Sequence, residues 1–142
     1  MQTLARAIVI ASLALPGHAL AQDADGTLSL ELNDAAETES GNCRLTYVGV
    51  NGTDVSLERT EYEVAIFDAE GTVDRLLLLK FGALVPGKTR ILQFELPQTQ
   101  CADISRIVIN DVSACTEAGG ADSDACMSAL SPSSRTPIRF GI

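Results

Sequence analysis

Three acidic side chains in one loop have the types and spacing that suit a calcium ion. Glu117, Asp122 and Asp124 lie in the segment 117–124 (EAGGADSD), where two glycines let the backbone bend freely. Carboxylate oxygens are the ligands that Ca²⁺ prefers. The segment lacks the further ligands and the distal Glu of an EF-hand loop, so the sequence favours a solvated loop and no cofactor. A calcium site is the alternative.

Nucleophilic catalysis needs a base beside the nucleophile, and the sequence offers few bases. Serines are plentiful, as in the segment 131–134 (SPSS), but the single histidine, His18, falls in the export signal described below. Lys80 and Lys88 occupy strand or turn positions that usually carry a surface charge. The sequence therefore predicts a protein that is not an enzyme, with a small hydrolase using carboxylates of 117–124 as the alternative.

Three arginines fall on strands that follow one another in the predicted order. Arg75, Arg90 and Arg106 predict either cross-strand ion pairs with Glu63 or Glu95, or a basic patch that docks a carboxylate of a partner protein. The chain as a whole is acidic, with a formal net charge of −9 at pH 7. Since phosphate contact needs a basic face, this charge argues against nucleic-acid binding.

The first 21 residues have the pattern of an export signal. Arg6 precedes the apolar run 7–15 (AIVIASLAL), which is too short to span a bilayer, and Ala19 and Ala21 supply the small residues that signal peptidase accepts. Cleavage near Ala21 would leave a single domain, 22–142, in the periplasm or outside the cell, with no membrane insertion. A retained membrane anchor is the alternative.

Alternation of apolar and polar residues predicts seven short strands and no long amphipathic helix. The run 76–79 (LLLL) fits a strand or a short helix, and we favour the strand. A core of 27–112 is expected to precede a loop-rich tail, 113–142, with one helical turn near 125–130. The expected strands are 27–33, 43–50, 61–67, 72–81, 89–96, 104–112 and 136–140. This pattern predicts an all-β, immunoglobulin-like antiparallel β-sandwich with a C-terminal loop tied by a disulfide.

Four cysteines in an exported chain favour disulfides over a metal site or a redox pair, because the spacings contain no C-x-x-C. Three pairings are possible. In a Greek-key sandwich the strand that begins at Cys43 lies antiparallel to the strand that ends before Cys101, so we expect these two to pair. Cys115 and Cys126 would then close the acidic loop.

The order of turns resembles the bacterial extracytoplasmic immunoglobulin-like modules of the FxLYD type. The resemblance covers roughly 27–112 and consists of Asn51 after a Val-rich strand and the segments 66–73 (IFDAEGTV), 84–89 (LVPGKT) and 94–96 (FEL). The chain is also similar to small exported Gram-negative proteins of unassigned function. The resemblance implies a role in binding and supplies no catalytic residues, and the cysteines depart from the FxLYD pattern.

These observations predict an exported binding or interaction module with no enzymatic activity. Its expected partner is another periplasmic or envelope protein. An edge strand beside the segment 136–140 would recruit that partner by strand addition, because an exposed sheet edge has free backbone groups.

Overall fold

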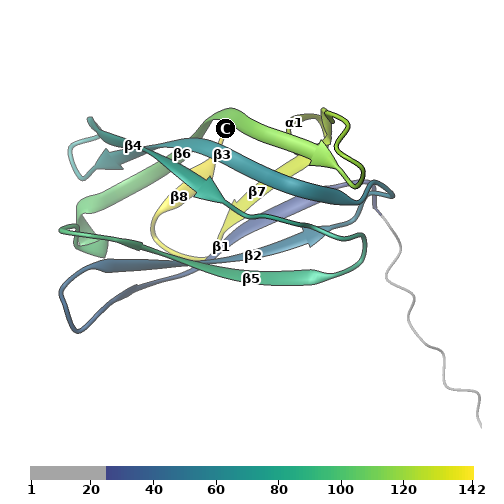
Figure 1. The fold of residues 1–142 in the computed structure, drawn as a ribbon. Helices are drawn as coiled ribbons and strands as arrows, with labels where there is room; N and C mark the ends of the chain where they lie inside the picture. Colours follow the sequence, from purple (N-terminus) through teal and green to yellow (C-terminus); the bar gives the residue numbers. More distant parts are fainter. Residues whose placement is uncertain (1–24) are drawn as a thin grey trace, which may run out of the picture.

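Eight strands form two sheets that pack face to face in the computed structural model, which describes residues 25–142 (Figure 1). Sheet A contains, in order, β5 (Thr89–Leu96), β2 (Cys43–Asn51), β1 (Leu28–Glu37) and β7 (Leu130–Ser134). Sheet B contains, in order, β4 (Val73–Lys80), β3 (Leu57–Asp68), β6 (Ile104–Glu117) and β8 (Arg139–Gly141). Short helices, η1 (Cys101–Asp103) and α1 (Ala125–Ser128), flank β6. The predicted all-β sandwich is confirmed.

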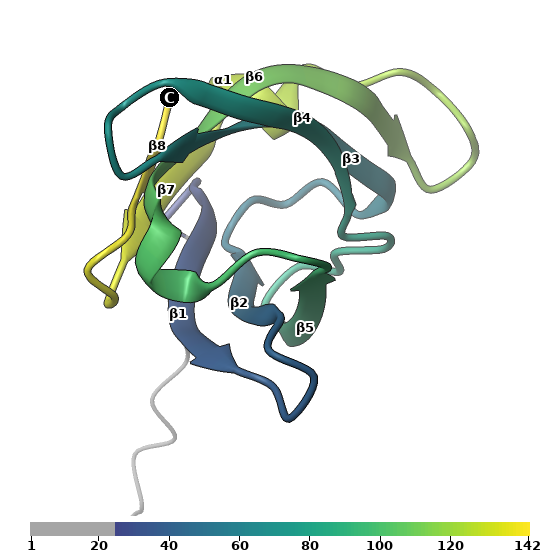
Figure 2. The same cartoon turned by 90° about the vertical axis from the view of Figure 1, so that its left-hand side faces the viewer.

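The core lies between the two layers seen in Figure 2 and follows the alternation of the sequence. Every second residue of β1 is buried, from Leu28 to Leu32, and the even-numbered residues in the middle of β3 are buried as well. Five aromatic rings meet in edge-to-face contacts around Tyr47 and Phe81; four come from strands of the two sheets, and Phe81 directly follows β4. This packing fixes which residues of each strand face outward.

The C-terminal tail contains more strand than the sequence predicts. β6 continues to Glu117, and β7 replaces part of the expected loop by pairing in parallel with β1. β8 pairs in parallel with β6, so the sandwich is antiparallel at every named pairing of residues 25–142 except these two. Pro132 is compatible with β7 because an edge strand needs hydrogen bonds on one side only.

Both expected disulfides are present, which confirms the predicted pairing. Cys43 faces Leu96 across the β2–β5 pair, and its sulfur bonds Cys101 with a Cα–Cα distance of 4.8 Å. The second bond joins Cys115 to Cys126, with a Cα–Cα distance of 5.9 Å. Two disulfides indicate an oxidising, extracytoplasmic environment. The predicted export signal, 1–21, lies outside the described residues, and no helix within 25–142 has the length and apolar character needed to cross a membrane.

Asn51, part of the FxLYD resemblance, has a structural role at the end of β2. Its side chain is fully buried and donates to the carbonyls of Val55 and Leu84, both at 2.8 Å. Its Oδ1 accepts from the backbone and the hydroxyl of Thr53 at 3.0 and 2.7 Å. With these bonds Asn51 fastens two loops to each other, which explains a buried amide in an apolar surrounding.

Candidate protein-binding surface

Among the strands of residues 25–142, β4 lies at the edge of sheet B and has one hydrogen-bonded neighbour, β3. Beyond its end, the backbone N–H of Phe81 donates to the carbonyl of Thr60 at 2.9 Å. Because bonding alternates along an antiparallel pair, the odd-numbered residues from Arg75 to Leu79 bond to β3 and the even-numbered ones face away, while a β-bulge at Asp74 shifts the register before them. The backbone groups of Leu76, Leu78 and Lys80 therefore point toward the free edge.

The outward face of β4 is apolar and exposed. The side chains of Val73, Leu76 and Leu78 are 49%, 54% and 45% exposed, and we call these three residues the β4 strip. Leu76 lies opposite Ala65 of β3, which in turn lies opposite the half-buried Val108 of β6. The strip thus borders the outer face of sheet B, where Ala65, itself only 6% exposed, lies between Leu76 and Val108. Contiguous apolar surface at a sheet edge is typical of a protein-binding site.

Charged and polar groups surround the β4 strip. Asp74 and the exposed Lys80 lie near opposite ends of β4. The guanidinium of Arg106 stacks over the ring of Phe67, with its Cζ 3.8 Å from the ring centroid. A central apolar area with a polar rim is the usual arrangement of a protein interface.

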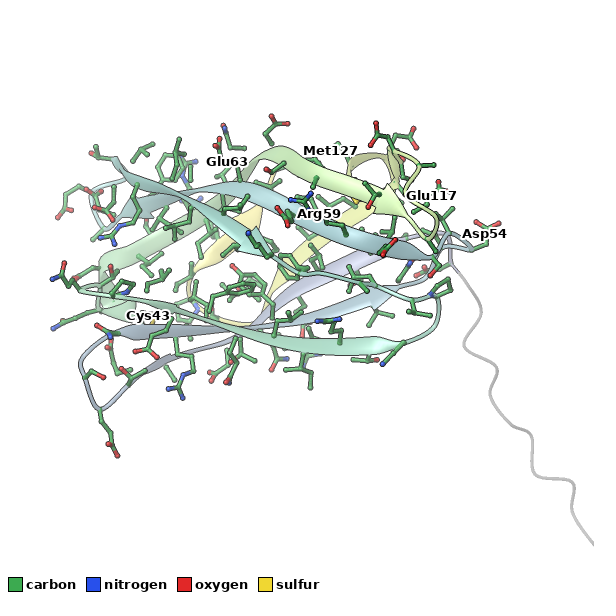
Figure 3. The ribbon with its side chains drawn as sticks, viewed as in Figure 1. Cys43, Asp54, Arg59, Glu63, Glu117 and Met127 are labelled. Carbon is green, nitrogen blue, oxygen red and sulfur yellow. A yellow bond between two sulfur atoms is a disulfide. The ribbon has the colours of Figure 1, made fainter. Side chains whose placement is uncertain are left out.

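The neighbouring strand β3 adds carboxylates to this rim. Glu63, labelled in Figure 3, lies opposite Leu78 and accepts a hydrogen bond from the amide of Asn110 at 2.6 Å. The pKa of Glu61 is lowered, first by the hydrogen bond from Arg59 at 2.8 Å and then by the charges of Arg59 and Lys80. Glu61 is therefore ionised near neutral pH, and Lys80 has an acidic neighbour in its own chain.

The other three edge strands of residues 25–142 are better protected. β8 has three residues, and β7 has five with Pro132 in the middle. β5 is as long as β4, but its outward face has one exposed large apolar residue, Ile91, which is followed by the polar Gln93 and Glu95. Of the described strands, β4 alone combines length, a free edge and an apolar outward face. The segment 136–140, expected to accompany a docking edge, contributes only to the short β8.

The structure does not bring the three predicted docking arginines together. Arg90 lies on β5 in sheet A and donates to the carbonyl of Ala83 at 3.0 Å. Arg75 bonds Asp74 beside it and the carbonyl of Pro97, and Arg106 lies on the outer face of sheet B. None of the three pairs with Glu63 or Glu95 within the described residues, since Glu95 pairs with Arg44. A role in partner binding stays a prediction, with Arg106 near the β4 strip.

The acidic loop folds as a tight turn at the end of β6. Glu117 donates its N–H to the carbonyl of Ala121 at 2.8 Å and accepts from the N–H of Gly120 at 2.9 Å. Figure 3 shows Glu117 at the end of the molecule opposite Cys43. Within 25–142 no three or more His, Cys, Asp or Glu side chains gather closely enough for a metal ion, so Glu117, Asp122 and Asp124 form no such group.

The leucines of the β4 strip are the residues that the sequence analysis missed. The run 76–79 has no visible alternation, because all four positions are leucine. In the structure Leu79 is buried and Leu77 partly buried, while Leu76 and Leu78 face outward. The charged Lys80, two residues after Leu78, is the sequence signal that the even-numbered side chains at the end of this run face solvent.

Comparisons with known proteins place the fold and no family. Neither the family models nor the curated proteins contain a match to this chain. Among solved structures, that of IrmA from Escherichia coli matches this chain with a TM-score of 0.55 and 15% sequence identity. The match covers 75% of this chain and 90% of IrmA. At this identity the similarity shows a shared fold, found in a small bacterial protein.

Proposed function

We propose that this chain is an exported protein-binding module without enzymatic activity, and that it docks its partner along β4. The observation that supports this proposal is the pair Leu76 and Leu78, which are exposed on an edge strand whose outer backbone groups pair with no other strand of residues 25–142. An added strand would satisfy those groups and cover the leucines at once.

Three further observations support the setting. The sequence predicts an export signal, both disulfides suit an oxidising compartment, and the resemblance to FxLYD-type modules implies binding. The protein would act in the periplasm or outside the cell, with a periplasmic or envelope protein as its partner. The acidic surface of the chain favours a protein partner over a nucleic acid.

The test is capture by the oxidised, exported protein, with two matched variants. Leu76→Asp combined with Leu78→Asp places charges on the free edge, and Ile91→Asp makes the same change on the outward face of β5. A captured protein is identified by mass spectrometry and rebound in pure form. We expect the double variant to lose the pure partner and the Ile91→Asp protein to keep it. Equal binding by all three proteins, or no binding by the unchanged one to any protein, a second copy of itself included, would overturn the proposal.

A further inference from the structure

The free edge of β4 has a sequence that complements itself. Two antiparallel copies of one strand pair so that the numbers of opposed residues have a constant sum, and one position lies on the two-fold axis. With Leu77 on the axis, Leu76 of one copy faces Leu78 of the other, and Lys80 faces the β-bulge of β4 at Asp74, whose carboxylate also bonds Arg75 of its own chain. Both ends of the strand pair would then carry opposite charges around an apolar centre.

The backbone geometry suits the same register. The N–H and C=O groups of Leu76, Leu78 and Lys80 point to the free edge, as the bond from Phe81 to Thr60 shows. Pairing about Leu77 places Leu76 and Leu78 opposite each other, where they can exchange both backbone hydrogen bonds. Leu77 then occupies the alternate, non-bonded position, where backbone groups are already directed to β3.

Neighbouring registers are poorer. With Leu76 on the axis, Asp74 faces a leucine of the second copy, and with Leu78 on the axis, Lys80 faces a leucine. Each shift therefore sets a charge against an apolar side chain and loses the ion pairs. The other long edge is not self-complementary, because pairing β5 about Leu92 would set Ile91 against Gln93.

We propose that a second copy of this chain covers the β4 edge, paired antiparallel about Leu77, so that two B sheets join into one continuous sheet. This inference rests on the proposed function of β4 as the docking edge and names its partner. Four leucines, two from each copy, become neighbours on the outward face, where Leu76 and Leu78 are about half exposed in the single chain. One strand pair forms a small interface, so the dimer is weak and depends on concentration.

The experiment is sedimentation equilibrium of the oxidised protein from about 1 µM to about 1 mM. We expect the unchanged protein to approach the mass of a dimer. Lys80→Asp sets two acids against each other at both ends and should weaken association at least about tenfold. Asp74→Lys combined with Lys80→Asp reverses both partners and should restore association to within about threefold. Lys88→Asp, with the same charge change outside β4, is the control and should leave association unchanged.

The double variant separates the contact between copies from effects within one chain. Lys80 also lies near Glu61 of its own chain, and Lys80→Asp places an acid there in both variants. Recovery in the double variant therefore supports the pair between copies. A monomer throughout the range, no recovery, or an equal loss with Lys88→Asp would overturn the inference. If the protein stays monomeric but binds another pure protein through Leu76 and Leu78, the proposed function holds and only the inferred dimer is overturned.

Discussion

β4 and β5 are both eight residues long and both form one edge of a sheet, yet they are protected very differently. On β5, Gln93 donates to the hydroxyl of Thr46 at 3.2 Å, and Glu95 accepts from Asn42 at 2.8 Å. β4 has exposed leucines in the corresponding outward positions. Since an unprotected edge strand can pair with another strand, the contrast supports the proposal that β4, and not β5, is the docking edge.

The disulfide beside β5 should have the largest effect on stability. Cys43→Ser combined with Cys101→Ser opens a loop with a sequence separation of 58, which the loop-entropy model values at about 4 kcal/mol. Cys115→Ser with Cys126→Ser, separated by 11, should cost about 3 kcal/mol. Urea unfolding measures both. At urea concentrations below the unfolding transition, the variant without the Cys43–Cys101 disulfide should still associate through β4. Loss of association in that variant would contradict the view that the β4 and β5 edges act independently.

Charges on the two edges should separate them next. Leu76→Asp with Leu78→Asp should weaken self-association at least about 100-fold, or about 2.8 kcal/mol, because four acids replace an apolar contact. Ile91→Asp on β5, where the side chain is 67% exposed, should leave it unchanged. Sedimentation equilibrium measures association, and thermal unfolding checks that both variants fold. A similar loss in Ile91→Asp would show that β4 has no special role.

The polar ties of β5 should have a smaller effect. The Asn42 side chain donates to Glu95 and accepts from the N–H of Gln98 at 2.9 Å, so Asn42→Ala should lower the free energy of unfolding by about 1 kcal/mol. Asn110→Ala on sheet B removes one exposed hydrogen bond, to Glu63, and should change it by less than about 0.5 kcal/mol. Urea unfolding compares the two. The reverse order would contradict the role of Asn42 as a tie.

Acid should destabilise the protein by protonating Glu95 on β5, which accepts the hydrogen bond from Asn42. The hydrogen bond from Asn42 is the largest of the effects, ahead of the charge of Arg44, that lower the pKa of Glu95 below its usual 4.5. The stabilisation is therefore fully present above about pH 4.5 and is lost as the pH falls through the lowered value. Melting temperatures from pH 7 downward should show a smaller acid decrease in Glu95→Gln than in the unchanged protein. Identical profiles would exclude this contribution.

Local pattern and topology predicted most of the fold. Alternation located the strands of 27–112, and the neighbouring positions of two predicted strands gave the Cys43–Cys101 pair. β7 could not be found in this way, because LSPSS is short, contains three serines and a proline, and forms a strand by pairing with the backbone of β1. Its strand character comes from a segment about 100 residues away in sequence.

The site was harder to predict than the fold, for two physical reasons. Arg75, Arg90 and Arg106 lie on consecutive strands, but the chain crosses from sheet B to sheet A after β4 and returns after β5. Sequence order therefore does not make them neighbours. The leucine run hides which side chains face outward, because identical residues show no period.

Amide hydrogen exchange at low and high protein concentration tests most directly whether β4 is the docking edge for a second copy. The N–H groups of Leu76, Leu78 and Lys80 should become slower to exchange as concentration rises, because they gain carbonyl acceptors in the second copy. Those of Leu77 and Leu79, directed to β3, and those of β5 should change little. Exchange at β4 that is independent of concentration, or protection that appears on β5 instead, would contradict the account.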